Sequence, residues 1–239
     1  MLNGCKTWAS NGEIADVFLI FAATNPEAGD SGISAFIVER DTSGFKVGYR
    51  EPTMGLRGLT CNTLYLDDCR VPAENLLGGE GEGLKIATKA LDFACLSLSA
   101  ICLGGAEAAL GAGVQFAIER EQFGGPIALK QAIQNFIADT AAEVEAVRYL
   151  VYHTAWLVDQ GRPYTKEAAI AKLIGSEVAM RAANKMLQVH GGYGYMKEYA
   201  IERMYRDFRA LRIMHGTSEM QRFAIARDIL KEKGLAIEP

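Results

Sequence analysis

One histidine near the end of the chain lies in the segment best suited to acid–base chemistry. Residues 212–221 read RIMHGTSEMQ, so His215 comes directly before a glycine, two hydroxyl residues and Glu219. Neutral imidazole is a competent proton acceptor near neutral pH, which makes His215 a candidate general base. Ser218 and Gln221 have the spacing of a capping box, which predicts a helix start here. His215 is therefore a catalytic group, a substitute for one, or part of an ordinary helix start.

One of two glycine-rich segments could allow close approach of the backbone to a ligand. It is residues 188–195, QVHGGYGY, whereas residues 77–83, LGGEGEG, mark a change of apolar period along the chain. Glycine permits this approach because it has no side chain, but a glycine pair after a helix is usually only a C-cap. We interpret His190 as a helix-end histidine bonded to the backbone, and Tyr193 and Tyr195 as packing residues.

The first third of the chain has the pattern of an antiparallel β structure. Short apolar runs at 17–21, 35–38 and 63–66 alternate with turn clusters at 25–32 and 41–44. The first four residues, Met1 to Gly4, have turn chemistry. We expect a partial β domain over residues 1–78.

From residue 84 onward apolar residues recur every three or four positions, which predicts helices over residues 79–239. The first stripe consists of Leu84, Ala87, Leu91, Ala94, Leu98, Ile101 and Gly105, and the second of Ile133, Ile137, Thr140, Val144, Val147, Val151, Ala155 and Val158. Thr165 is the expected N-cap of a third helix through about Leu187, and a shorter helix follows around Tyr199 to Phe208. Long helices with short connections describe a bundle.

The segment from Phe93 to Ile118 contains a single charged residue, Glu107, and is long enough to span a bilayer. It is rich in Gly, Ala and Ser, and a helix that is apolar all round can equally be buried among other helices. We expect a buried helix and no membrane span.

Composition favours a protein without a nucleic-acid partner. The 239 residues are 49% hydrophobic and 23% charged, and the net charge of -4 gives no general attraction to phosphate polymers. The five cysteines include no CxxC pair, no histidine stands at zinc-ligand spacing, and no secretory leader precedes them. We therefore expect reduced thiols, a cytoplasmic location and no metal site.

Five segments, in order and in register across the chain, resemble the acyl-CoA dehydrogenase family. They are residues 2–12 (LNGCKTWASNG), 77–83 (LGGEGEG), 119–124 (EREQFG), 188–195 (QVHGGYGY) and 216–219 (GTSE). Members of this family are flavoenzymes that place an α,β double bond in a fatty-acyl thioester. The resemblance implies an α+β fold, a partial antiparallel β-barrel followed by an up-down four-helix bundle. The family's N-terminal helical domain and the first part of its barrel have no counterpart in this sequence.

The resemblance also implies contacts with FAD. Trp8 and Ser10 match positions at the isoalloxazine ring, and Thr217 and Glu219 match flavin contacts at the start of the last helix. Further positions match residues that reach the FAD of a neighbouring subunit, with the arginine at the pyrophosphate: Arg120, Gln122, Phe123, Gln188, Gly191 and Gly192. A guanidinium fork suits that anion.

The usual catalytic base is missing from both positions where the family carries it. Many members have a glutamate where this chain has His215, and another branch has it where this chain has Ala94, followed by an arginine where this chain has Cys95. Three possibilities remain: His215 is the base, a carboxylate from elsewhere serves, or the chain does not catalyse the reaction. Asp92 and Glu219 are alternative carboxylates here, although Glu219 more simply stabilises its helix. Asp92 and Gly216 are the expected substrate contacts, and the His215 N–H can polarise the thioester carbonyl.

The resemblance thus implies an FAD-dependent acyl-CoA dehydrogenase that passes electrons to an electron-transfer flavoprotein. A homo-oligomer, dimer or tetramer, is expected, because Arg120, Gln122 and Gln188 have their flavin role only between subunits. The alternative is a truncated or non-catalytic homologue that serves as a flavin-binding or assembly subunit.

Overall fold

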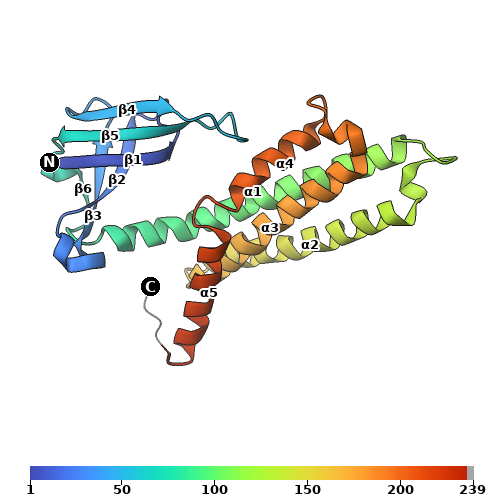
Figure 1. The fold of residues 1–239 in the computed structure, drawn as a ribbon. Helices are drawn as coiled ribbons and strands as arrows, with labels where there is room; N and C mark the ends of the chain where they lie inside the picture. Colours follow the sequence, from blue (N-terminus) through green and yellow to red (C-terminus); the bar gives the residue numbers. More distant parts are fainter. Residues whose placement is uncertain (236–239) are drawn as a thin grey trace. The chain divides into compact units, whose positions relative to one another are not determined.

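The structure is a computed structural model that describes residues 1–235. The chain forms two compact units, one comprising Met1–Ala90 and the other beginning at Leu91. Strands occupy the first unit and helices dominate the second (Figure 1). The α+β class with an antiparallel part followed by a helical bundle is therefore confirmed, while a domain boundary at residue 78 stays a prediction.

The first unit contains two three-stranded antiparallel sheets, with strand orders β1–β5–β4 and β2–β3–β6 (Figure 1). The strands are β1 (Leu2–Ser10), β2 (Val17–Ala23), β3 (Ile33–Glu39), β4 (Phe45–Arg50), β5 (Cys61–Cys69) and β6 (Leu76–Leu77). The three predicted runs correspond to β2, β3 and β5. The expectation of turn chemistry at the start was wrong, because Leu2–Gly4 belongs to β1 and Leu2 is buried.

The two sheets share one apolar core because alternate residues of each strand face inward. Phe18 of β2 and Phe45 of β4 meet there with ring centroids 4.7 Å apart. The remaining buried members are Leu2, Ile20, Val38, Leu64, Leu66 and Cys69. Arg40 closes one end of this core by donating hydrogen bonds to the carbonyls of Ala15 and Gly12.

The second unit is built from long helices with short connections. The helices are α1 (Gly83–Glu119), whose residues up to Ala90 still belong to the first unit, α2 (Gln131–Asp159), α3 (Thr165–His190), α4 (Ala200–Leu211) and α5 (Ser218–Glu232). α3 packs against α2, α4 and α5 (Figure 1). The connection at 161–163 ends α2 as predicted, with Gly161 in a left-handed conformation that suits glycine.

The bundle core confirms the second predicted stripe and corrects the first. Thr140, Val144, Val147 and Val151 of α2 are buried, and the other members of that stripe are at least partly buried. On α1, Leu91 and Ile101 are exposed. The buried face runs instead through Cys95, Leu98, Cys102, Ala106 and Ala109. Small residues form most of this buried face, so the positions of the large apolar residues of α1 did not identify it.

α1 is also the one helix among residues 1–235 that is long and apolar enough to cross a membrane. In its most apolar window, 44% of the residues are buried inside the structure, and a core helix meets the same criterion. The prediction of a buried helix holds for one face of the segment, since Phe93, Ile101 and Ile118 are exposed.

Two adjacent glycines of α1 provide a matched test of this packing. A methyl group added at Gly105 would lie 2.6 Å from the Phe208 ring of α4, whereas one added at Gly104 meets nothing within 4 Å. We expect Gly105→Ala to lower the free energy of unfolding of the bundle, since overpacking costs about 1–3 kcal/mol and exceeds the helix-propensity gain of about 1 kcal/mol. Gly104→Ala keeps that gain and should raise the stability in the same denaturant titration. Equal shifts in both variants would contradict the observed helix contact.

Candidate functional site

Four of the residues predicted to bind FAD line one cavity of about 460 Å³ in the helical unit. Arg120 and Gln122 come from the connection that follows α1, and Gly191 and Gly192 from the turn that follows α3. These segments are far apart in the sequence but meet because α1 and α3 both end here. Phe116, Ile127, Val189, His190, Tyr193 and Met196 complete the wall.

The cavity combines one positive charge with backbone that no side chain covers. The Arg120 guanidinium lies over the Tyr193 ring, 5.1 Å from its centroid, and has no carboxylate partner among residues 1–235. Side chains added at Gly191 or Gly192 would meet nothing within 4 Å, so the backbone there borders open space. A guanidinium without a carboxylate partner can bind phosphate oxygens, and bare backbone beside it permits their close approach.

His190 has the structural role that the sequence predicts. Its Nδ1 lies 2.7 Å from the carbonyl oxygen of Met186, and its ring stacks on Phe116 with centroids 4.4 Å apart. Tyr193 packs edge-on against Tyr199, as expected for a packing residue. The same prediction for Tyr195 was wrong, because its side chain is 80% exposed at the end of the turn.

Phe123 and Gln188 lie outside the cavity wall. Phe123 is 88% exposed at the tip of a tight turn whose ends are joined by a bridge between Glu121 and Pro126. Gln188 is exposed near the end of α3. An aromatic ring held in solvent by a tight turn is available for contact with another subunit.

Trp8 and Ser10 belong to the first unit. The register of β1 against β5 shifts between Lys6 and Ala9, which places Trp8 in a β-bulge. Its side chain is 76% exposed, and Ser10, paired with Cys61, is exposed as well. Bulges commonly re-aim a side chain beside an active site.

Backbone strain marks three of the predicted site residues. Six non-glycine residues among those described have a positive φ, and three of them are Trp8, Phe123 and His215. A left-handed conformation costs a non-glycine residue about 1–3 kcal/mol and persists only where its surroundings enforce it. Such strain concentrates at functional sites, which favours a role for all three.

The His215 turn connects α4 to α5. His215 and Gly216 have φ values of 54° and 84°, and the imidazole is exposed. The main-chain carbonyls of the turn face the interior. That of His215 accepts from Gln221 Nε2 at 3.0 Å and from Cys95 Sγ at 3.6 Å. That of Gly216 accepts from Lys172 Nζ at 2.5 Å.

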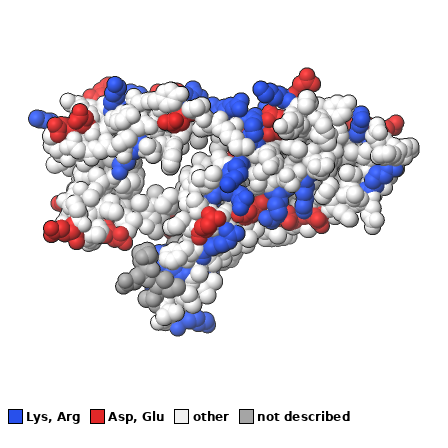
Figure 2. Space-filling model, viewed as in Figure 1, with Lys and Arg blue, Asp and Glu red and all other residues white. Residues whose placement is uncertain are grey.

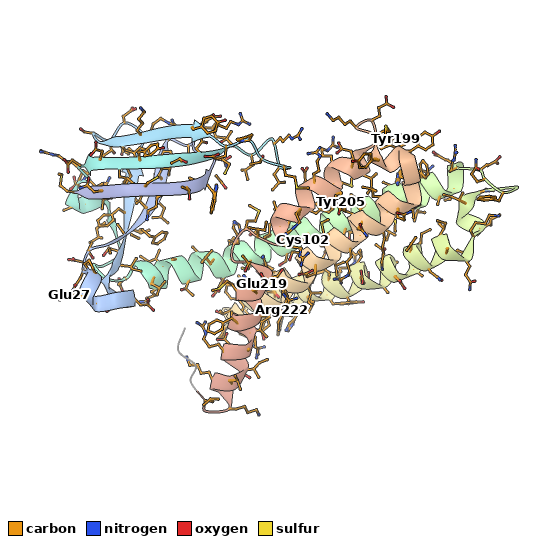
Figure 3. All side chains as sticks on the ribbon, in the orientation of Figure 1. Glu27, Cys102, Tyr199, Tyr205, Glu219 and Arg222 are labelled. Carbon is orange, nitrogen blue, oxygen red and sulfur yellow. The ribbon has the colours of Figure 1, made fainter. Side chains whose placement is uncertain are left out.

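The predicted capping box at the start of α5 was wrong by one residue. Thr217 is the N-cap, and its hydroxyl accepts from the N–H of Met220 at 3.3 Å. Ser218 instead donates to Glu177 of α3, and Gln221 is directed to the turn carbonyls. Glu219 lies near the start of α5 (Figure 3), where bonds from its own N–H and from Thr217 lower its pKa. That carboxylate therefore stabilises its helix.

Asp92 ties α1 to α3. Its carboxylate accepts a 2.6 Å hydrogen bond from the Thr165 hydroxyl. The prediction of Thr165 as the N-cap of α3 was wrong, because Thr165 is the first residue of the helix and Tyr164 is the N-cap. Burial raises the pKa of Asp92, against the opposing effect of the Thr165 bond. Both family base positions lie close together, since Cys95 next to Ala94 contacts the carbonyl of His215.

The raised pKa of Asp92 predicts a pH-dependent gain in stability for Asp92→Asn. A carboxyl whose pKa is raised on folding binds its proton more tightly in the folded state, so its ionisation destabilises the fold at neutral pH. Asparagine keeps an acceptor for Thr165 without the charge. We expect a higher thermal midpoint than wild type at pH 7 and a vanishing difference as the pH falls toward about 4.

Asp139→Asn, which removes an exposed carboxylate of α2, is the control for this comparison. It should change the midpoint little at either pH. A wild-type midpoint above that of Asp92→Asn at pH 7 would show that ionised Asp92 stabilises the fold.

The predicted residues of the helical unit lie in two separate sites, the cavity that contains Arg120 and Gly191 and the turn that contains His215. Lys172, which contacts the His215 turn, and Val189, which lines the cavity, are 17 positions apart, which corresponds to about 26 Å along α3. No contact among residues 1–235 joins Arg120 or Gly191 to His215. This separation is compatible with cofactors shared between subunits.

Sequence reasoning missed the interior residues that hold the His215 turn. Lys172 and Glu177 of α3 received no role, and Gln221 was assigned only to the cap. A signal for Lys172 existed, because it lies on the helix face of Ala168 and Gly175, both buried. A lysine among small buried residues indicates a specific partner.

On the surface of the helical unit, basic and acidic side chains are interspersed (Figure 2).

Two family models match this chain. The acyl-CoA dehydrogenase middle domain matches residues 1–69, and the acyl-CoA dehydrogenase C-terminal domain matches residues 81–230. Acryloyl-CoA reductase (NADH) of Anaerotignum propionicum is 50% identical over 97% of this chain and 59% of its own length. The caffeyl-CoA reductase-Etf complex subunit CarC of Acetobacterium woodii is 42% identical over 97% and 61%.

Solved structures give the same result. Butyryl-CoA dehydrogenase from Megasphaera elsdenii has a TM-score of 0.94 and 42% identity, covering 95% of this chain and 60% of that one. The FAD complex of PigA has a TM-score of 0.92 and 33% identity, covering 96% and 60%. FAD is the cofactor that these relatives indicate. The chain spans about 60% of the length of the relatives it matches. Across the middle and C-terminal domains, the chain belongs to the acyl-CoA dehydrogenase family.

Proposed function

We propose that this chain works in an assembly as a FAD-dependent acyl-CoA dehydrogenase-like oxidoreductase. The observation that carries the proposal is the cavity where Arg120, Gln122, Gly191 and Gly192 converge, with the guanidinium free of any carboxylate partner among the described residues. A structural bundle has no need of bare backbone beside an unpaired cation in a cavity.

FAD would be held by two sets of residues. Arg120, Gln122, Gln188, Gly191 and Gly192 serve its nucleotide side from one subunit. Trp8, Ser10, Thr217 and Glu219 serve the flavin side, with Phe123 as an intersubunit contact. When bound, FAD supplies the acceptor for the hydride that leaves the substrate. The exposed aromatic residues of α2 support the assembly, since Tyr149, Tyr152 and Trp156 share one helix face and are 68%, 65% and 46% exposed.

His215 is proposed as the general base, with Gly216 and Asp92 as substrate contacts. Its exposed imidazole takes the proton from Cα of the acyl thioester while the hydride leaves Cβ, giving the enoyl thioester. The N–H groups of His215, Gly216 and Thr217 donate to no backbone carbonyl among residues 1–235. They can therefore stabilise the enolate charge that develops on the thioester oxygen.

The substrate class is an acyl-CoA thioester. Relatives named for acryloyl-CoA and butyryl-CoA support a short acyl group, and the reductases among them support catalysis in either direction. An electron-transfer flavoprotein is the proposed redox partner, as the Etf complex of the caffeyl-CoA reductase subunit suggests. The five free cysteines support a cytoplasmic location.

A second candidate is a homologue that binds flavin or assembles with relatives without catalysing the reaction. The specific observation in its favour is the lack of a carboxylate at both base positions: His215 occupies one and Ala94 the other. Cys95, where an arginine is expected, is buried against the His215 turn and is not free to contact CoA.

Anaerobic addition of butyryl-CoA to the FAD-loaded chain separates the two candidates. The enzyme proposal predicts loss of the visible flavin absorbance as the cofactor is reduced. A protein that retains FAD but keeps its absorbance with acyl-CoA thioesters of short and long chains would support the non-catalytic candidate.

A further inference from the structure

Lys172 of α3 is the only fully buried Lys, Arg, Asp or Glu among residues 1–235. An ammonium group removed from water destabilises the fold by several kcal/mol unless it is well paired. Its neighbours on the same helix face are small residues such as Ala168 and Gly175, so the long side chain is not needed to continue an apolar stripe. The contacts of its Nζ must therefore offset the cost of burying the charge.

The contact is the His215 turn. Lys172 Nζ donates to the Gly216 carbonyl at 2.5 Å, and Gln221 of α5 donates to the carbonyls of both His215 and Gly216. Cys95 of α1 adds a third donor to His215. Three helices thus direct interior donors at two consecutive carbonyls, and both residues are left-handed. This convergence enforces a backbone that His215 would otherwise avoid.

The direction of these carbonyls fixes the direction of the adjacent N–H groups. In a planar trans peptide the C=O and N–H point in opposite directions. Because the carbonyls of His215 and Gly216 point inward, the N–H groups of Gly216 and Thr217 point away from the interior donors. A donor on a peptide carbonyl also polarises the N–H of the same peptide, which strengthens it as a hydrogen-bond donor.

We propose that Lys172 is a positioning residue that, with Gln221, sets the left-handed His215 turn from the interior. It keeps the imidazole outward and presents the N–H groups of Gly216 and Thr217 to a substrate oxygen. The positioning itself is a property of the fold, and its effect on the reaction rests on the proposed function. Burial lowers the pKa of Lys172, while neighbouring Glu177 and Glu219 act in the opposite direction.

Lys172→Met separates positioning from core filling. Methionine has a similar length and no charge, and replacing a buried ionic group with an apolar one is often neutral or stabilising. If Lys172 only fills space, the variant should unfold at the same or a higher temperature with an unaltered turn. If Lys172 positions the turn, the same variant should keep its overall stability and FAD content while residues 212–221 exchange deuterium faster.

The expected increase in the exchange rate of residues 212–221 lies between about tenfold and a hundredfold, the range for losing a hydrogen bond to a charged group. In the FAD-loaded full chain, the rate of flavin reduction at saturating butyryl-CoA should fall by a similar factor, with a smaller change in KM. Lys185→Met is the control. It removes a lysine of the same helix that pairs with Asp139, and should change neither quantity.

Gln221→Leu, which removes the second interior donor, should loosen the same residues if Lys172→Met does not fold. Unchanged exchange of residues 212–221 in the folded variants would overturn the proposal. A wild-type chain whose flavin no acyl-CoA reduces would contradict the proposed function, and the exchange measurement would still decide whether Lys172 positions the turn.

Discussion

Replacing His215 with alanine is expected to slow flavin reduction by acyl-CoA by about a hundredfold or more, the range for losing a general base. The imidazole is exposed on a turn whose carbonyls are held from the interior, so its removal leaves the backbone donors in place. FAD content and the thermal midpoint should therefore match wild type. Anaerobic stopped-flow measurement of the flavin absorbance gives the rate directly.

His153→Ala is the matched control because His153 is an exposed histidine of α2 that stacks on Trp156. It should reduce its flavin at the wild-type rate. His215→Glu places a carboxylate at the family's usual base position and should recover at least part of the rate lost in His215→Ala. A His215→Ala variant as fast as wild type would exclude His215 as the base and direct attention to a carboxylate from elsewhere.

Arg120→Ala is expected to weaken FAD binding by between about tenfold and a hundredfold, as for the loss of a charged hydrogen bond to phosphate. Arg120 is the free cation of the cavity, and no other side chain among its described lining residues carries a positive charge independent of pH. Arg120→Lys should bind with intermediate affinity, because an ammonium keeps the charge and loses the planar fork. Fluorescence titration of FAD into the apoprotein measures each constant.

Arg209→Ala is the control for this series. Arg209 is an exposed arginine in the last turn of α4 and does not line the cavity. Its removal should leave the FAD affinity unchanged. Equal weakening by both substitutions would indicate a general charge effect, and no weakening by Arg120→Ala would remove the pyrophosphate from this cavity.

The sequence predicted the elements better than their faces. The period of the valines in α2 identified its buried side correctly because large apolar residues dominate that face. α1 packs through Cys102, Gly105 and Ala109 instead, so its apolar period pointed partly to the exposed Leu91 and Ile101. Close packing by small residues depends on the partner helix, which no local pattern contains.

The candidate site divides in the same way. Glycine pairs and an arginine after a helix are local signals, and the structure brings Arg120, Gly191 and Gly192 to one cavity. The interior of the His215 turn depends on contacts such as that between Lys172 and Gly216, 44 residues apart in sequence. A capping pattern cannot show that Gln221 serves the turn and not the helix end.

Sedimentation of the purified chain with FAD, followed at the visible flavin absorbance, tests whether the cofactor is held between subunits. We propose that FAD binds between subunits, through residues that lie in separate places of each chain. The flavin absorbance should therefore sediment with an assembly of chains and not with a monomer, and Arg120→Ala should release it. If the protein sediments as a colourless assembly while the flavin absorbance stays in solution, FAD is not bound between these subunits.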